Sequence, residues 1–435
     1  MPNSLCSSFD PEMKRWSSSQ LSRAAEFTYA TLALFALTQG PVTRLWSQSS
    51  KFIELLPSPT VSHVQFATYV VLQVPALALW IRRVEASWWR ERANQFLFAF
   101  IGWLGLSVFW STFARYSFPE FVSLLLTTSF GMYLATSYSL RQFWWLVTSA
   151  LTLGVGLSWI AVMRLWDGAV DFQEDYWVGI YYNRNSLAPV SAVALIGTSA
   201  LFITARRSDS RNWLARVFFA TTLGVVVASI AAIELWQSDS RTSPLALLIA
   251  LITCLLWLAT RRLTRDSLGL IASHKSSTLL TLGLVALTIF AGIRFELGVG
   301  GLDESRTAFN QRGGIWSISW SGVLEKPLHG WGWMAAWHTP AFLISDDRPS
   351  WKAWGMEWSH NGYLDLLLGA GLPAALLFAF SVAAYSERIS KASNFDGFSR
   401  LSIVTFVLVA ATQESFFIGS HFLWALLVAS LAIKA

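Results

Sequence analysis

Charged residues are scarce in this chain. Asp, Glu, Lys and Arg make up 13% of its 435 residues, about half of the roughly 25% found in soluble globular domains. Disordered segments and coiled coils are rich in charge, so this composition excludes both. Hydrophobic residues account for 54%, and the sequence therefore predicts an integral membrane protein rather than a soluble enzyme.

Cysteine is also nearly absent. Cys6 lies in a polar, Ser-rich stretch and Cys254 lies inside an apolar run, so we expect no disulfide. Residues 1–24 lack the pattern of a cleaved signal peptide, and we expect a cytoplasmic tail there. The net charge of +6 does not indicate a nucleic-acid partner, because the basic residues are shared among short loops.

Long apolar runs are the main positive feature of the sequence. A membrane-spanning helix needs about 20 apolar residues, and twelve runs approach that length: 25–40, 61–81, 95–112, 119–139, 143–163, 186–205, 215–235, 244–260, 277–293, 362–385, 401–416 and 418–433. We therefore predict an all-α polytopic membrane protein with about twelve transmembrane helices. Its parts are nine helices over 25–293, one large, partly helical extracytoplasmic loop over 294–360, and three helices over 361–435.

The orientation is predicted from the basic residues, because Lys and Arg in short loops stay on the cytoplasmic side. With the N-terminus inside, short cytoplasmic segments hold 20 Lys and Arg residues and short external segments hold six. This asymmetry predicts that both termini are cytoplasmic.

Arg184 and Arg241 are two of the six exceptions. Each lies at the predicted outer end of a span, in NRNS (183–186) and SDSRTS (238–243). A lone arginine at a helix end often only extends to the membrane surface, and that interpretation stays open for both.

The long external loop adds a third arginine and many aromatic residues. Arg312, Trp316 and Trp320 are spaced four residues apart, so they share one face of a predicted helix. Residues 295–360 hold eight of the 24 tryptophans. Such enrichment suits either a surface that stacks on sugar rings or an aromatic belt at the membrane interface.

His360 directly precedes the apolar run at 362–385 and is followed by Asn361. An imidazole at that point lies at the membrane surface, where it can serve as a general base. A solvated histidine at a helix start is the alternative.

Four segments together resemble the bacterial O-antigen ligase and polysaccharide polymerase family. They are NRN (183–185), SR (240–241), QRGGIWSISWSGVLEKPLHGWGW (311–333) and HNGYLDLLLGAGLPA (360–374). The family pattern in the last segment is His-Asn, nine residues, then Gly-x-x-Gly. His360, Asn361 and Gly371 match this pattern, whereas Ala374 replaces the final glycine.

The resemblance implies a fold like that of lipid-dependent glycosyltransferases of the GT-C type. It also implies transfer of a glycan from a polyprenyl (undecaprenyl) diphosphate carrier to an acceptor hydroxyl at the outer face of the bacterial inner membrane. By motif position, the catalytic residues are Arg241, Arg312 and His360. Substrate-binding residues are predicted to be Arg184, Asn185, Asn361, Trp316 and Trp320.

The chemistry of these residues agrees with the resemblance. The planar, permanently charged guanidinium group suits diphosphate oxygens, and neutralised diphosphate departs without a strong general acid. The first external loop, 41–60, has Glu54 as its only acid, and the Asp346–Asp347 pair resembles an ordinary solvated loop. We therefore expect neither a metal nor another cofactor.

Two questions stay open from the sequence. A ligase that joins the glycan to a lipid core or a protein, and a polymerase that joins glycan units to one another, need the same donor site. A membrane transporter, or a transport-associated protein of the same family, is the alternative function. Transporters usually place ionisable residues near mid-membrane, and the predicted spans lack them there.

Overall fold

A computed structural model describes residues 18–42, 59–172, 174–205, 213–267, 283, 308–339, 358–417 and 419–433. Its α-helices are α1 (Ser18–Leu37), α3 (Pro59–Arg83), α4 (Arg92–Leu106), α5 (Ala114–Ser137), α6 (Leu140–Met163), α7 (Arg184–Ala205), α8 (Trp213–Gln237), α9 (Thr242–Ser267), α11 (Ala308–Glu325), α13 (Gly362–Lys391), α14 (Asn394–Ala410) and α15 (Phe422–Ala432). Short 3-10 helices are η2 (Ala86–Arg90), η3 (Ser107–Trp110) and η4 (Ala336–His338).

The predicted class of an all-α, multi-pass membrane protein is confirmed. Within the described ranges, six helices are long and apolar enough to cross a membrane, namely α4 with η3, α5, α6, α7, α9 and α13. The only strands there, β1 (Val170–Asp171) and β2 (Tyr176–Trp177), form a small antiparallel hairpin. The run at 277–293 lies outside the described residues except for Gly283, so the number of twelve spans stays a prediction.

One predicted boundary was wrong. The run at 401–416 was predicted to be one span, but α14 ends at Ala410, and residues 411–417 and 419–421 lie in turns and bends before α15. The physical reason is the polar pair Gln413 and Glu414 inside this run. Their side chains bond to other parts of the chain, which a continuing lipid-facing helix would not allow.

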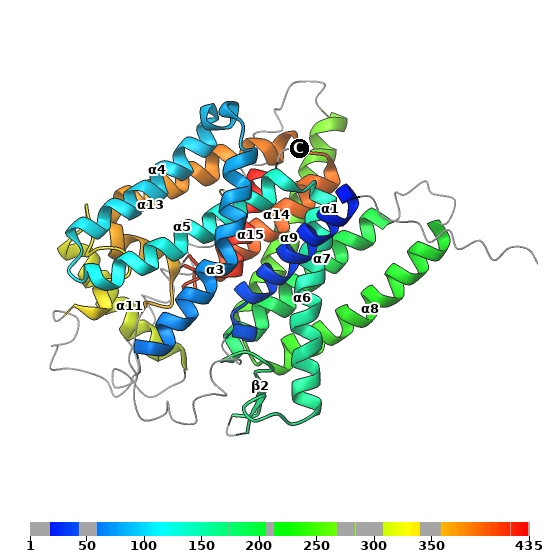
Figure 1. The fold of residues 1–435 in the computed structure, drawn as a ribbon, viewed down its shortest axis with the longest axis horizontal. Coiled ribbons are helices and arrows are strands. Elements are labelled where there is room, and N and C mark those ends of the chain that lie inside the picture. Colours follow the sequence, from blue (N-terminus) through cyan, green and yellow to red (C-terminus); the bar gives the residue numbers. More distant parts are fainter. Residues whose placement is uncertain are drawn as a thin grey trace, which may run out of the picture.

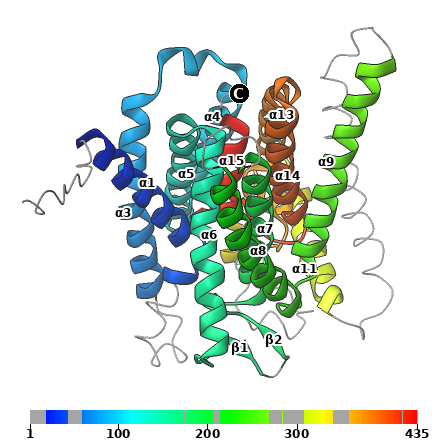
Figure 2. The same cartoon turned by 90° about the vertical axis from the view of Figure 1, so that its right-hand side faces the viewer.

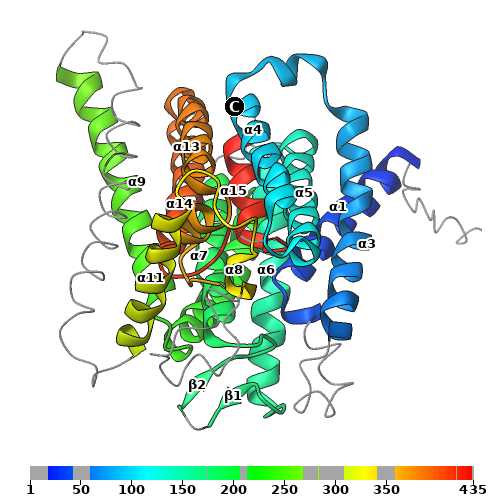
Figure 3. The ribbon, with the colours of Figure 1, turned by 90° about the vertical axis from the view of Figure 1, so that its left-hand side faces the viewer.

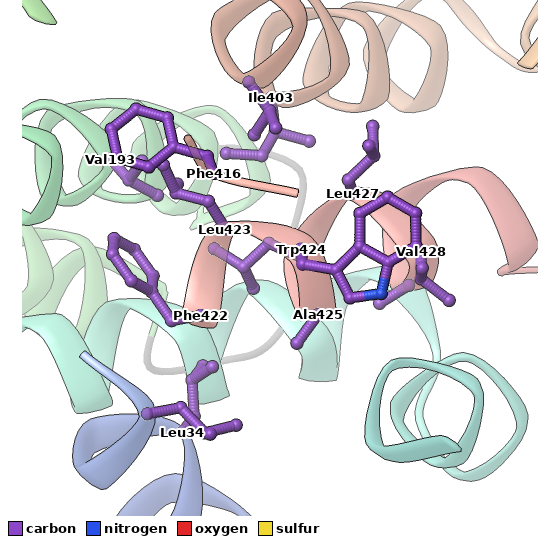
Figure 4. Packing of buried hydrophobic residues seen from close by; sticks show 14 of the residues in the cluster. Leu34, Val193, Ile403, Phe416, Phe422, Leu423, Trp424, Ala425, Leu427 and Val428 are labelled. Carbon is purple, nitrogen blue, oxygen red and sulfur yellow. The ribbon is translucent and has the colours of Figure 1, made fainter. Parts of the chain in front are cut away.

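Helix α15 lies at the centre of the bundle. All eleven of its residues are buried, and it packs between α5 and α14 (Figures 1 and 3). Figure 4 shows Phe422, Leu423 and Trp424 surrounded by apolar side chains from α1, α7 and α14. The Trp424 indole donates to Thr128 Oγ1 at 2.8 Å, so the one polar atom of this large side chain is satisfied.

Several helices begin at the same end of the bundle. The β1–β2 hairpin, α11 and the starts of α7, α9 and α13 lie at the lower end in Figure 2, opposite the C-terminus and the connection between α3 and α4. We call this lower end the hairpin end and the opposite one the C-terminal end. Backbone N–H groups at each of these helix starts carry partial positive charge.

A break within α13 fixes the loop that follows α11. Gly371 has φ of 72° inside the helix, and the backbone N–H of Leu372 donates to the Pro327 carbonyl at 2.8 Å. A Cβ atom on Gly371 would lie 2.5 Å from the Leu328 carbonyl, so glycine is required both for its conformation and for the close approach. This contact gives Gly371 of the His-Asn-x9-Gly pattern a physical role, because it holds the segment after α11 against α13.

Candidate functional site

Four segments that are distant in the sequence meet at the hairpin end. They are the start of α7, the helix α11, the residues just before α13, and the turn between α14 and α15. Their contacts centre on one carboxylate, that of Glu414. We call the group of Asn185, Arg312, His360, Gln413 and Glu414 the Glu414 cluster.

The two oxygens of Glu414 serve three partners. Oε1 accepts from Asn185 Nδ2 at 2.7 Å and from Arg312 Nη2 at 2.6 Å, while Oε2 lies 3.1 Å from His360 Nδ1. Arg312 Nη1 also donates to Gln413 Oε1 at 3.0 Å. The carboxylate therefore holds an arginine and a histidine beside each other.

The ionisation of Glu414 determines which ring nitrogen of His360 carries the proton. Burial would raise the pKa of the Glu414 carboxyl, but Arg312 and His360 more than offset burial and hold that pKa below its usual range. An ionised carboxylate can only accept hydrogen bonds, so the proton of the neutral imidazole lies on Nδ1. The Nε2 atom of His360 then carries the lone pair, as a general base requires.

The backbone of His360 is held in an unusual conformation. Its φ is 52°, in the left-handed region that side-chain-bearing residues seldom occupy. The neighbouring Ser359 is fixed on both sides. Its backbone N–H and hydroxyl donate to Asp365 Oδ1 at 2.9 and 2.7 Å, and its carbonyl accepts from the Trp316 indole at 3.0 Å. These contacts maintain the strained residue that places the imidazole next to Glu414.

Asn361 caps helix α13. Its side-chain oxygen accepts from the backbone N–H groups of Tyr363 at 3.0 Å and Leu364 at 3.2 Å. Such a cap satisfies N–H groups that the helix itself leaves unpaired. The His-Asn pair thus combines a residue beside the carboxylate with a residue that starts the helix.

Asp365 joins the two halves of the site. It accepts from Ser359 on one side and from the Ser415 hydroxyl on the other, and the backbone N–H of Gly362 donates to the Ala411 carbonyl at 2.9 Å. Ser415 is next to Glu414 in the chain. The segments that carry His360 and Glu414 are therefore bound to each other and not only to the same partner.

The NRN segment divides its roles in a similar way. Asn183 Oδ1 accepts from the backbone N–H of Ser186 at 2.9 Å, which caps α7. Asn185 points to Glu414 and also accepts from the Ser240 hydroxyl at 3.2 Å. Arg184 lies over the Tyr176 ring at 4.7 Å and pairs with Asp239 at 3.2 Å.

Arg241 is placed near this site by its neighbour in the chain. Ser240, directly before it, contacts Asn185, and Arg241 itself is exposed just before the start of α9. The structure thus brings Arg312, His360 and Asn185 into direct contact through Glu414, with Arg184 and Arg241 on adjoining segments.

Six of the eight tryptophans in residues 295–360 lie in the described part of the chain, and four of them are buried: Trp316, Trp331, Trp333 and Trp337. For these four, burial contradicts both a sugar-stacking surface and an interfacial belt. The backbone N–H groups of Trp331 and Gly332 donate to carbonyls of α13, which holds this part of the loop against that helix. Trp320 differs, because 42% of it is exposed. The roles of Trp316 and Trp320 in substrate binding stay predictions.

The sequence interpretation missed Glu414 and Gln413, since both lay within a predicted span. Their only signal was the polar segment TQES (412–415) inside an apolar run. Within the described part of the chain, no group of three or more His, Cys, Asp and Glu side chains could hold a metal ion. Glu54, Asp346 and Asp347 lie outside that part, so metal independence stays a prediction.

Comparison with known proteins supports the resemblance seen in the motifs. Residues 226–379 match the family model described as O-antigen ligase, and no curated protein matches the chain. The matched segment contains Arg241, Arg312, His360 and Asn361. Asn185 and Glu414 lie outside it, so the Glu414 cluster joins the family segment to parts of the chain that the match does not cover.

Proposed function

Because residues 226–379 match the O-antigen ligase family, we propose that this protein transfers a glycan from a polyprenyl diphosphate carrier to an acceptor hydroxyl. We further propose that undecaprenyl diphosphate is the carrier and that the reaction occurs at the outer face of the bacterial inner membrane. The observation that supports this most strongly is the contact of His360 and Arg312 with the same buried carboxylate.

The transfer is one displacement at the anomeric carbon. The acceptor oxygen forms a bond to that carbon while the bond between the carbon and the diphosphate oxygen breaks. The electron pair of the broken bond leaves with the diphosphate, and the hydroxyl proton passes to Nε2 of His360. The resulting imidazolium is stabilised by the negative charge of Glu414 at its Nδ1 side.

In this proposal the arginines bind the diphosphate leaving group. Arg312 contacts the diphosphate directly, and Arg241 and Arg184 add positive charge from the starts of α9 and α7. A guanidinium group presents parallel N–H groups that match two phosphate oxygens. The partial positive charge at the helix starts acts in the same direction. Charge on the departing diphosphate is then neutralised by residues of the chain itself, and we propose that no divalent metal is needed.

Asn185, Asn361, Trp316 and Trp320 complete the proposed substrate site. Asn185 and Asn361 shape it, the first through Glu414 and the second through the start of α13. Trp316 holds the segment before His360 in place, because its indole donates to the Ser359 carbonyl. Trp320 is the exposed ring of the pair, so we assign the sugar contact to Trp320. The acceptor is a glycan, a lipid core or a protein.

The proposed topology places the hairpin end outside the cytoplasm. It keeps twelve spans of the GT-C kind, with both termini cytoplasmic and residues 294–360 external. Single cysteines at Phe172, on the hairpin, and at Ser87, in η2, test this in a chain without Cys6 and Cys254. Both positions are exposed. A membrane-impermeant thiol reagent added outside is expected to label Phe172→Cys only, and labelling of Ser87→Cys alone would reverse the orientation.

The test of the reaction is transfer by the purified protein in lipid vesicles. Glycan-loaded undecaprenyl diphosphate and candidate acceptors are supplied with excess chelator, and the glycosylated product and released undecaprenyl diphosphate are quantified together. We expect both to appear in equal amounts. Uptake of a solute without any product would instead favour a transporter, and a strict Mg²⁺ or Mn²⁺ requirement would reject metal independence.

A further inference from the structure

Glu414 places a negative charge where the proposed substrate is itself negative. Its side chain is only 9% exposed, whereas that of Arg312 is 20% exposed. The carboxylate is thus less accessible to solvent than the guanidinium group that it contacts. A diphosphate that approaches Arg312 meets an arginine already occupied by an internal anion.

The contacts of Arg312 are divided rather than paired. One terminal nitrogen, Nη2, donates to Glu414 and the other, Nη1, donates to the neutral side chain of Gln413. A guanidinium group binds most strongly when two of its N–H groups meet two oxygens of the same anion. A diphosphate that offers two oxygens to the two terminal nitrogens would make the paired contact that Arg312 lacks here.

We propose that Glu414 is a positioning residue that exchanges partners during the reaction, holding Arg312 in the empty site and releasing it to the donor diphosphate. This inference rests on the proposed function. After the exchange, Glu414 keeps Asn185 and His360 as its partners.

The exchange has a consequence for the base. While Arg312 contacts Glu414, its positive charge offsets the carboxylate charge that would stabilise a protonated imidazole. When the diphosphate takes Arg312, the full charge of Glu414 acts on His360. His360 then becomes a better proton acceptor when the leaving group is in place. Donor binding thereby prepares the acceptor side of the site.

This switch predicts opposite effects on binding and on turnover. Glu414→Gln removes the competing charge from Arg312, so undecaprenyl diphosphate is expected to bind more tightly, by roughly tenfold, or about 1.4 kcal/mol. The same variant cannot fix the proton of His360 on Nδ1, because the amide can present a donor at that position. Turnover of the glycan-loaded donor is expected to fall by about 10⁴-fold, the scale seen for loss of a carboxylate that orients a catalytic imidazole.

Glu26→Gln provides the matched control. Glu26 also pairs with an arginine, Arg83, but at the C-terminal end of the bundle. This variant removes one carboxylate from one Arg–Glu pair, as Glu414→Gln does, and is expected to change neither donor affinity nor turnover.

The measurements are the dissociation constant of undecaprenyl diphosphate and the turnover number, for the full chain in lipid nanodiscs. Weaker donor binding by Glu414→Gln, or turnover near that of the wild type, would overturn the exchange.

If Glu414→Gln does not fold, Glu414→Asp is used instead. Its shorter side chain keeps the charge but cannot reach every partner, so the same split is expected with smaller changes. An unchanged affinity in that variant would also overturn the exchange. A wild-type protein that transfers no glycan would instead reject the proposed function.

Discussion

Two arginine–glutamate pairs lie at opposite ends of this bundle, and they are built differently. At the C-terminal end, Arg83 Nη2 donates to Glu26 Oε2 at 2.9 Å, and Arg83 Nη1 contacts Glu26 Oε1. Both oxygens of one carboxylate thus meet both terminal nitrogens of one guanidinium group. Tyr133 and Ser137 add hydroxyl contacts from α5 at 2.9 and 2.8 Å. The pair therefore fastens α1, α3 and α5 together.

At the hairpin end the carboxylate is shared instead. Glu414 meets Arg312 through one oxygen only and directs its other oxygen to His360. It is also the more buried of the two acids, with a side chain 9% exposed against 20% for Glu26. The comparison shows that Arg83 and Glu26 form a bidentate ion pair in which each side chain satisfies the other. In the Glu414 cluster, by contrast, one acid contacts two different groups.

Arg→Lys substitution is expected to affect transfer strongly at the hairpin end and not at the C-terminal end. A lysine ammonium cannot reproduce two parallel N–H contacts with phosphate. Loss of two charge-assisted hydrogen bonds, at about 1.5 to 3 kcal/mol each, is expected to lower transfer by Arg312→Lys more than a hundredfold. Arg83→Lys is expected to leave transfer unchanged. Glycan transfer at matched expression measures both variants, and equal rates for the two would remove the distinction between the pairs.

A smaller effect is expected from the glycine at the break in α13. Gly371→Ala places a Cβ atom against the Leu328 carbonyl and forces alanine to adopt a positive φ. The expected loss of folding stability is about 1 to 3 kcal/mol. Gly102→Ala, in α4, is the control, because a Cβ atom there meets nothing within 4 Å. It is expected to be neutral or stabilising in a helix. Thermal unfolding in detergent compares them, and an equally mild effect at Gly371 would show that the loop after α11 does not depend on this break.

The smallest effect concerns pH. The pKa of Glu414 is held below its usual value of 4.5 by Arg312 and His360 against the opposing effect of burial. A lowered pKa in the folded state contributes stability above the usual value, and this contribution is lost as the pH falls through the folded value. The stability difference between the wild type and Glu414→Gln is therefore expected to shrink as the pH falls below about 4.5. Unfolding midpoints across this range measure it, and a difference that grows in acid would contradict the assigned charge.

Much of the hairpin end could be predicted from the sequence. Arg312 and His360 were identified from their position outside the membrane and from the family pattern, and the structure brings them to one carboxylate. Asn361 was predicted to bind substrate, which stays a prediction, and the structure shows in addition that its side chain caps α13. These residues lie at helix ends, where local sequence determines local geometry.

Glu414 could not be predicted in the same way. It lies 54 residues beyond His360, and its partners come from α7, α11 and the start of α13. Only packing of the whole bundle brings them together. The buried tryptophans show the same limit, because composition reveals enrichment but not which face of a loop folds inward. Arg83 and Glu26 are likewise 57 residues apart in the sequence, so no local sequence pattern could predict that they pair.

The most direct test of the account is the separation of donor binding from transfer in His360→Asn. Asparagine tolerates a positive φ better than most residues, so this variant removes the imidazole while it favours the same backbone. Binding of undecaprenyl diphosphate is expected to be unchanged, since Arg312 remains, while transfer is expected to fall by about 10² to 10⁴-fold. A variant that binds the donor normally and still transfers at about a tenth of the wild-type rate or faster would contradict His360 as the base.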